Sequence, residues 1–345
     1  MIDLRSDTLT LPTPEMLASI PSAHFGDSGR WNEERRGEDG SINKLEDKAA
    51  ELMGKEAAAF CGSGTMGNSS ALLTHCRPGD CVLVDDRQHL YRSEKGIFNP
   101  RIGQLLAVVY AADENGYPDV DSIETLLKEH NAKVVCVENT HNNRGGLCLP
   151  LPVMKAVYET AHRYGAKVHL DGARIFNAAA TLGIAASEIA QYADSVMFCV
   201  SKGLGAPVGS LVCGTKEFIY ELRETRRILG GDMRQAGVLA APALYALEHN
   251  ITRLADDNRH AAEITAGIRD LKTIRGPEKC DSNIVMLTVP SGRSEELRDR
   301  LKAHCVVSGA VDDCRVRLVL HQEISDSDTA ETIRILRVVD GEMCN

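Results

Sequence analysis

Short apolar runs alternate with helical patterns from about residue 41 to residue 213, and this alternation leaves few folds open to the chain. It predicts a mostly parallel sheet wrapped by helices, because neighbouring parallel strands must be joined by long crossover connections. The predicted strands are residues 57–61, 81–84, 105–110, 133–137, 167–170, 195–200 and 210–213. Helical spacing of apolar residues marks residues 41–53, 66–75, 121–130 and 152–164. We therefore expect a large α/β domain with a seven-stranded sheet.

The pattern changes beyond this region. Residues 215–268 show no strand signal and predict a long helical stretch with a break near residues 229–232. After about residue 270, predicted strands at 283–289 and 315–320 alternate with predicted helices at 294–304 and 326–339. We therefore expect a large domain over residues 1–265 with an N-terminal arm, joined by the long helix to a small C-terminal α+β domain over residues 266–345.

Charge and cysteine content restrict the function further. The 345 residues include 39 Lys and Arg against 49 Asp and Glu, a net charge of -10, which argues against nucleic acid or an anionic membrane as a partner. The N-terminus lacks the features of a signal peptide, and no window approaches the roughly 18 apolar residues of a membrane span. The 11 cysteines lack paired metal-site spacing, so we expect buried, reduced thiols, no metal site and a cytoplasmic location.

A glycine-rich turn at residues 62–68 lies between a predicted strand and a predicted helix. Such a turn brings backbone N–H groups at a helix N-terminus close to an anion, of which a phosphate is the natural example. The same letters satisfy G-x-G-x-x-G, and Asp85 and Asp86 follow about 20 residues later, as in dinucleotide sites. A nucleotide-binding oxidoreductase and a turn without a ligand both remain open at this point.

Asp171 and Lys202 each follow a predicted strand of the same sheet. Because ligands bind beyond the carboxyl ends of parallel strands, Asp171 is expected at the active edge, although an Asp there is also a common helix N-cap. Lys202 lies between an apolar strand and a Gly-rich turn, where a desolvated amine can attack a carbonyl and form a Schiff base. The alternative is a solvated surface lysine.

Together these three features match pyridoxal phosphate. That cofactor needs an anion site for its phosphate, an amine for its aldehyde and a carboxylate for its ring nitrogen. The dinucleotide hypothesis explains only the glycine-rich turn and leaves Lys202 and Asp171 without a role.

The chain also resembles a known family, the low-specificity L-threonine aldolases of the β-eliminating lyase group. Their fold is the aspartate-aminotransferase-like fold type I of pyridoxal-phosphate enzymes. The strings that carry the resemblance are residues 4–8, 63–68, 138–141, 169–174, 201–210, 233–237 and 317–319, in family order across nearly the whole chain.

The resemblance implies roles for the cofactor-binding residues. Lys202 would form the Schiff base, Asp171 would pair with the ring nitrogen, and Gly64 and Thr65 would hold the phosphate. His89 would stack on the ring and act as a base, unless it is an ordinary surface histidine after a strand.

The substrate residues follow in the same way. Ser6, Arg174 and Arg317 would bind the substrate α-carboxylate, with Arg174 also near the cofactor, and His141 would lie near the substrate hydroxyl. Two further arginines, Arg227 and Arg234, would reach a cofactor phosphate, partly across a subunit interface, or would be ordinary helix-surface charges.

The resemblance implies a lyase of amino-acid metabolism that cleaves β-hydroxy-α-amino acids to glycine and an aldehyde. Residues 26–41 depart from the family pattern: they are longer, and they hold the only Trp. This segment lies near the substrate in the family, so racemisation or β-elimination on the same scaffold stays an alternative. The family builds its site from two chains, which implies a homotetramer arranged as a dimer of dimers.

Overall fold

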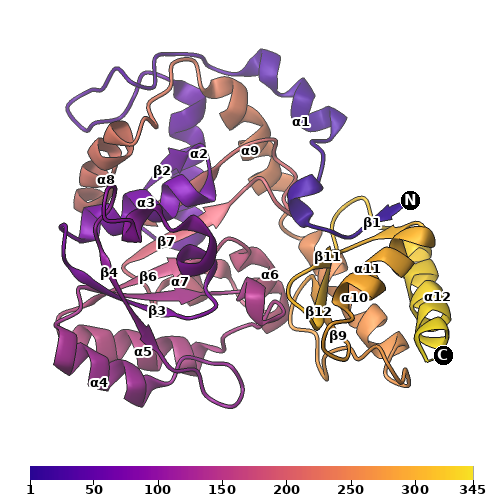
Figure 1. The fold of residues 1–345 in the computed structure, drawn as a ribbon. Coiled ribbons are helices and arrows are strands. Elements are labelled where there is room, and N and C mark those ends of the chain that lie inside the picture. Colours follow the sequence, from indigo (N-terminus) through magenta and orange to yellow (C-terminus); the bar gives the residue numbers. More distant parts are fainter. Residues whose placement is uncertain (345) are drawn as a thin grey trace.

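The computed structural model describes residues 1–344 and contains the predicted seven-stranded sheet. Its strands lie in the order β2-β8-β7-β6-β5-β3-β4, and only β8 runs antiparallel to its neighbours (Figure 1). The fold is therefore α/β, as the alternating pattern predicts. The strands are β2 (Ala57–Cys61), β3 (Cys81–Asp85), β4 (Leu106–Tyr110), β5 (Val134–Glu138), β6 (Lys167–Asp171), β7 (Ser195–Cys199) and β8 (Ser210–Gly214).

Side chains alternate between two cores on opposite faces of this sheet. On β2, Ala58 and Phe60 join the core on one face, whereas Ala59 and Cys61 join a core on the other. Helices cover both faces, which explains why the strands read as continuous apolar runs. These helices are α2 (Gly40–Met53), α3 (Gly64–His75), α4 (Val120–His130), α5 (Leu151–Arg163), α6 (Ile175–Leu182), α7 (Ala186–Ala190), α8 (Lys216–Ile228) and α9 (Gly237–His249).

The cysteines follow the prediction in the sheet region. All eleven are free, and seven are buried. Burial raises the pKa of Cys61 and of Cys148 to about 12, so these thiols stay protonated and inert. Cys305 and Cys344 are exposed, which the prediction of buried thiols did not anticipate.

The expected long helix is interrupted twice rather than once. After the break that follows α8, a second break separates α9 from α10 (Leu254–Gly267). Here Asn250 Nδ2 donates to Leu204 O at 2.9 Å and Arg253 Nη2 donates to Gly203 O at 2.6 Å. The chain therefore leaves its helical path where it binds the turn that carries Lys202.

A second core lies in the C-terminal part of the chain, to the right of the large sheet in Figure 1. It holds the predicted elements β9 (Ile284–Thr288), α11 (Ser294–Ala303), β12 (Arg315–Val319) and α12 (Asp326–Met343), with β11 (Gly309–Ala310) added to the small sheet. The N-terminal strand β1 (Ile2–Asp3) pairs here with β10 (Val306–Val307), and Leu4 joins this core. The division at residues 265 and 266 stays a prediction.

Short helices complete the described chain, and none of its helices is both long and apolar enough to cross a bilayer. The short helices are η1 (Asp7–Leu9), α1 (Pro14–Ala18), η2 (Ile20–Ser22), η3 (Leu90–Glu94), η4 (Gly96–Phe98) and η5 (Asn142–Arg144).

Candidate active site

Several of the predicted site residues gather at the carboxyl edge of the sheet. Asp171 is the last residue of β6, Lys202 follows β7, and the N-terminus of α3 follows β2. His89 follows β3 and His141 follows β5. Because the parallel strands end at the same edge, segments far apart in sequence meet there.

Asp171 is buried, 4% exposed, and is held by neutral donors. Asn68 Nδ2 donates to its Oδ2 at 3.0 Å, and the Ala173 backbone N–H donates to its Oδ1 at 3.0 Å. Within residues 1–344 no cationic side chain forms an ion pair with it. A buried carboxylate without a cation is the environment that a protonated ring nitrogen would complete. Sequence reasoning missed Asn68, although it lies in the matching string 63–68.

Lys202 lies in the tight turn that the second helix break supports. The Gly205 N–H donates to Lys202 O at 2.8 Å, and Gly205 adopts φ +81°. In the described chain Lys202 Nζ has no hydrogen bond or ion pair, and Lys202 lines a small cavity with Arg174 and Cys199. Its amine is therefore not committed to another side chain of the described chain.

The N-terminus of α3 presents two backbone N–H groups without a partner in the described chain. Ser63 caps the helix by accepting from the Met66 N–H at 3.1 Å, whereas the Gly64 and Thr65 N–H groups have no partner in residues 1–344. Gly67 allows the helix to pack closely on β7, since a Cβ there would lie 2.7 Å from Met197 Cγ. The prediction of an anion site at Gly64 and Thr65 is compatible with this geometry.

His89 is joined to Asp171 through a hydrogen-bonded chain. His89 Nδ1 lies 3.0 Å from Glu94 Oε1, and this oxygen also accepts from Asn68 Nδ2 at 2.9 Å. The hydrogen bond with Glu94 raises the pKa of His89, against the effect of its burial. His89, Glu94 and Asp171 bring ligand atoms within 4.8 Å of one another, and the absence of a metal at this point stays a prediction.

Two arginines converge at the position predicted for the substrate carboxylate. Arg174 Nη1 and Arg317 Nη1 donate to the same oxygen, Asn142 Oδ1, at 3.2 and 2.9 Å. Asp7 occupies the other edge of Arg174, with Nε to Oδ2 at 2.6 Å and Nη2 to Oδ1 at 2.8 Å. Arg317 Nε is buried without a partner, and burial lowers the Arg317 pKa. An anion beside Arg317 would satisfy this donor.

The remaining substrate residues are placed less directly. Ser6 Oγ accepts from the N–H and the hydroxyl of Thr8, at 3.2 and 2.8 Å, and within residues 1–344 it forms no hydrogen bond with Arg317 or Arg174. His141 is 5% exposed and faces Asp85 and Glu138 across β3 and β5. Sequence reasoning treated Asp85 only as a dinucleotide residue and did not assign Glu138.

Arg227 and Arg234 bind the 26–41 loop rather than the cavity. Arg227 stacks on Trp31 at 4.1 Å and donates to Gly29 O, and Arg234 pairs with Asp27 at 3.0 Å. In residues 1–344 neither forms a hydrogen bond or ion pair with Gly64, Thr65 or Lys202. Their predicted role across a subunit interface stays a prediction.

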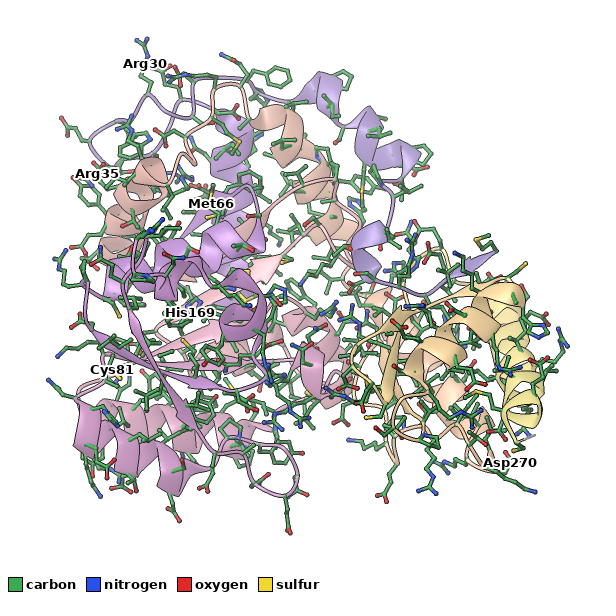
Figure 2. All side chains as sticks on the ribbon, viewed as in Figure 1. Arg30, Arg35, Met66, Cys81, His169 and Asp270 are labelled. Carbon is green, nitrogen blue, oxygen red and sulfur yellow. The ribbon has the colours of Figure 1, made fainter. Side chains whose placement is uncertain are left out.

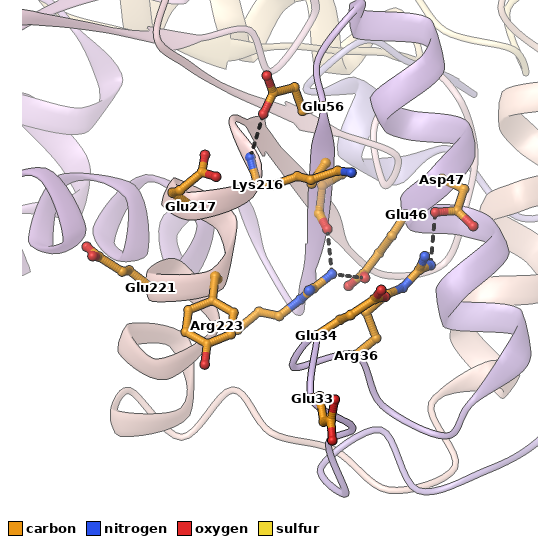
Figure 3. A pocket seen from close by; sticks show the side chains of 13 residues that line it. Glu33, Glu34, Arg36, Glu46, Asp47, Glu56, Lys216, Glu217, Glu221 and Arg223 are labelled. Atoms are coloured by element: carbon orange, nitrogen blue, oxygen red, sulfur yellow. Dashed lines mark hydrogen bonds and ion pairs between the residues drawn. The ribbon is translucent and has the colours of Figure 1, made fainter.

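The 26–41 loop lies at the outer edge of the large unit, where Figure 2 labels Arg30 and Arg35, far from Asp270 at the other end. A cavity of about 720 Å³ borders this loop and the starts of β2 and α8 (Figure 3). Two ion pairs lie within its wall, Arg223 with Glu46 at 2.6 Å and Arg36 with Asp47 at 2.9 Å. This cavity lies at the amino end of β2, so it is separate from the site at the carboxyl edge.

Comparison with known proteins adds independent evidence. Residues 3–290 match the family model described as β-eliminating lyase. The chain is 37% identical over 344 residues to low-specificity L-threonine aldolase 1 of Arabidopsis thaliana, covering 96% of this chain and 94% of that protein. It is 37% identical over 336 residues to the low specificity L-threonine aldolase of Escherichia coli K12, covering 96% and 97%. The solved threonine aldolase of Leishmania major has the same fold, with a TM-score of 0.82, 19% identity and coverage of 99% and 100%.

Proposed function

Because this chain belongs to the β-eliminating lyase family, we propose that it cleaves β-hydroxy-α-amino acids, L-threonine and L-allo-threonine among them, to glycine and an aldehyde. The enzyme is a pyridoxal-phosphate-dependent lyase of fold type I. One structural observation supports the reaction most: two arginines converge at a buried position beside a free lysine and a buried carboxylate.

The residues of the carboxyl edge fit the cofactor. Lys202 would hold its aldehyde carbon, Asp171 its ring nitrogen, and the N–H groups of Gly64 and Thr65 its phosphate. Bound there, pyridoxal phosphate supplies an electron sink for the carbon that loses its bond to the departing aldehyde. The unpaired amine of Lys202 and the uncompensated charge of Asp171 are the observations behind this fit.

Arg317 and Arg174 bind and orient the substrate. The Arg317 Nε–H and Arg174 Nη1, which donates to Asn142 Oδ1 in this structure, would donate to the α-carboxylate, with Ser6 as the third predicted donor. A fixed carboxylate would restrict the orientation of the substrate about Cα, and this orientation decides whether the Cα–Cβ or the Cα–H bond breaks.

One of two histidines, His89 or His141, takes the proton of the substrate hydroxyl in this proposal. Glu94 accepts from His89 Nδ1, so Nε2 is the nitrogen that remains free to take the proton of the substrate hydroxyl. The His89 side chain is 42% exposed, which gives it access to a bound substrate.

We also propose a cytoplasmic homotetramer. Apolar side chains on the N-terminal segment and around the α8–α9 connection are exposed, as Leu11 at 68%, Phe25 at 50% and Ile228 at 83%. Neighbouring chains would cover them, near the arginines that bind the 26–41 loop. Light scattering coupled to size-exclusion chromatography would measure the mass directly.

The test is turnover by the purified holoenzyme. We expect glycine and aldehyde from L-threonine, L-allo-threonine or phenylserine, and neither product from Lys202→Ala, which should also lose the visible absorption of bound cofactor. Absence of glycine from all three substrates would contradict the aldolase assignment. Deuterium entering Cα without aldehyde release would instead support racemisation or β-elimination.

A further inference from the structure

The buried ring of His141 lies between two carboxylates. Its Nε2 lies 3.3 Å from Asp85 Oδ1, and its Nδ1 lies 3.9 Å from Glu138 Oε2. The two side chains of the closer pair are 5% and 4% exposed. In the part of the chain that the structure describes, neither ring nitrogen has a partner with hydrogen-bond geometry. The two nitrogens differ in the distance to the carboxylate that each faces.

Asp85 is fixed by groups other than His141. Arg144 donates to Asp85 Oδ2 from Nη2 at 2.7 Å and from Nε at 3.1 Å, and the Arg87 N–H donates to Oδ1 at 2.7 Å. Burial would raise the Asp85 pKa, but His141 and Arg144 hold it below its ordinary value. Asp85 is therefore an oriented, charged acceptor next to Nε2.

Both carboxylate oxygens of Glu138 accept hydrogen bonds from backbone N–H groups. Its Oε2 accepts from the His89 N–H at 2.8 Å, and its Oε1 accepts from the Asn142 N–H at 2.8 Å. Burial raises the Glu138 pKa. At 3.9 Å it forms no hydrogen bond with His141 Nδ1, so this nitrogen has no partner in the described chain.

Two further ionisable groups, Tyr110 and Asp86, lie near His141, Asp85 and Glu138. The Tyr110 hydroxyl on β4 donates to Cys136 O at 2.9 Å, and burial raises its pKa well above the ordinary value. Asp86 lies 3.4 Å from Arg144 and is 51% exposed. Neither provides an alternative acceptor for the His141 ring.

We propose that Asp85 is a positioning residue: it accepts from His141 Nε2, with Arg144 holding Asp85, and thereby leaves His141 Nδ1 to meet the hydroxyl of a bound β-hydroxy amino acid. This inference rests on the proposed aldolase function. A histidine whose second nitrogen is held by a carboxylate keeps one tautomer and one ring orientation.

The first test measures the tautomer of His141 without substrate. Protein labelled with ¹⁵N-histidine gives ring nitrogen shifts, and a His141→Asn variant assigns the signal. We expect wild-type His141 to carry its neutral-state proton on Nε2, and Asp85→Asn to change its shifts. Asp86→Asn is the matched control, because it removes a neighbouring carboxylate that does not touch His141, and it should leave the shifts unchanged.

The second test uses turnover. Asp85→Asn should lower kcat by roughly 10- to 100-fold while KM for L-threonine changes little, because the substrate still binds through its carboxylate. Asp85→Glu should restore part of kcat, and Asp86→Asn should stay near wild type. Unaltered His141 shifts in Asp85→Asn, or equal losses of kcat in the two Asn variants, would overturn the proposal.

Misfolding of Asp85→Asn and inactivity of the wild type can each be distinguished from failure of this proposal. If Asp85→Asn fails to fold, Arg144→Gln removes the support of Asp85 and should change the His141 shifts in the same direction, and unchanged shifts would again contradict the proposal. If the wild type releases no glycine, the proposed function fails, whereas the spectra still decide whether Asp85 holds His141.

Discussion

At the scale of single residues, Arg317 provides the sharpest test of substrate binding. Arg317→Gln removes the charge beside the predicted carboxylate position, and we expect KM for L-threonine to rise roughly 10- to 100-fold, as for a lost charged hydrogen bond of about 1.5–3 kcal/mol. Arg315→Gln is the control, because Arg315 lies two residues earlier on β12 and binds Asn143 O and Asp312 instead. Equal KM values for the two variants would argue against a carboxylate site at Arg317.

Glu94 provides a second test through pH. The hydrogen bond with Glu94 raises the His89 pKa, and a base must be unprotonated to act, so wild-type activity falls as the pH drops through that pKa. Glu94→Gln removes the negative charge and lowers the His89 pKa, which should move the acidic limb of kcat/KM to lower pH. If the acidic limb of the kcat/KM profile has the same position in wild type and in Glu94→Gln, His89 is not the group whose titration produces it.

Some of these residues could be predicted from sequence and others could not. Asp171 and Lys202 could be predicted as site residues because each lies at the end of an apolar strand and is followed by small residues. Glu94 and Asp7 carry no such signal, because their roles depend on His89 and Arg174, which lie close only after folding. Local sequence reveals the position of a side chain on an element, but it does not reveal that side chain's partner on another element.

At the scale of elements, the turn after β7 positions Lys202 through a glycine. Gly205 has φ +81°, and a Cβ there would lie 3.3 Å from Thr10 Cγ2 and 3.4 Å from Met16 Cε. Gly165 offers a matched control, because it has φ +75° and no atom within 4 Å of its added Cβ.

We expect both Gly→Ala variants to lose roughly 1 kcal/mol of stability from backbone strain, measured by urea unfolding. Only Gly205→Ala should also lower the absorbance of bound cofactor per chain, because only that turn carries the lysine. Equal cofactor loss in both variants would contradict the positioning role of the turn.

The pattern of apolar residues predicted the helices and strands well where a single pattern ran through the whole element. Each of the seven strands of the large sheet differs from its predicted bounds by one residue or less at either end. The break between α9 and α10 was missed because Asn250 and Arg253 leave the helical path for tertiary hydrogen bonds with the Lys202 turn, which no local pattern records.

At the scale of the whole molecule, three distant segments meet at Asp7. Its carboxylate binds Arg174 of the large unit and accepts from Asn283 Nδ2 of the C-terminal unit at 3.2 Å. Asp7 itself belongs to the N-terminal segment, whose first strand pairs with β10. The sequence predicted an N-terminal arm but gave no reason to place it between the two cores.

Because Asp7 joins these three segments, we expect its substitution to lower the stability of the protein strongly. Asp7 is fully buried, so Asp7→Asn leaves the buried Arg174 charge unpaired and should cost about 3–5 kcal/mol in urea unfolding at neutral pH. Asp3→Asn is the control, because Asp3 forms a partly exposed pair with Arg5 in the same segment and should cost less than about 1 kcal/mol. Similar losses in the two variants would show that Asp7 does not join the units.

The pH dependence of the same pair supplies the last prediction. Burial opposes ionisation of Asp7, but Arg174 lowers its pKa from 3.8 to about 2 in the folded protein. A lowered carboxylate pKa stabilises the fold above the unfolded value, and this contribution disappears as the pH falls through the folded value. The difference in unfolding free energy between wild type and Asp7→Asn should therefore be constant above about pH 4 and shrink by roughly 2 kcal/mol toward pH 2. A difference that persists unchanged at pH 2 would mean that packing, rather than the charge of Asp7, holds the N-terminal segment between the two cores.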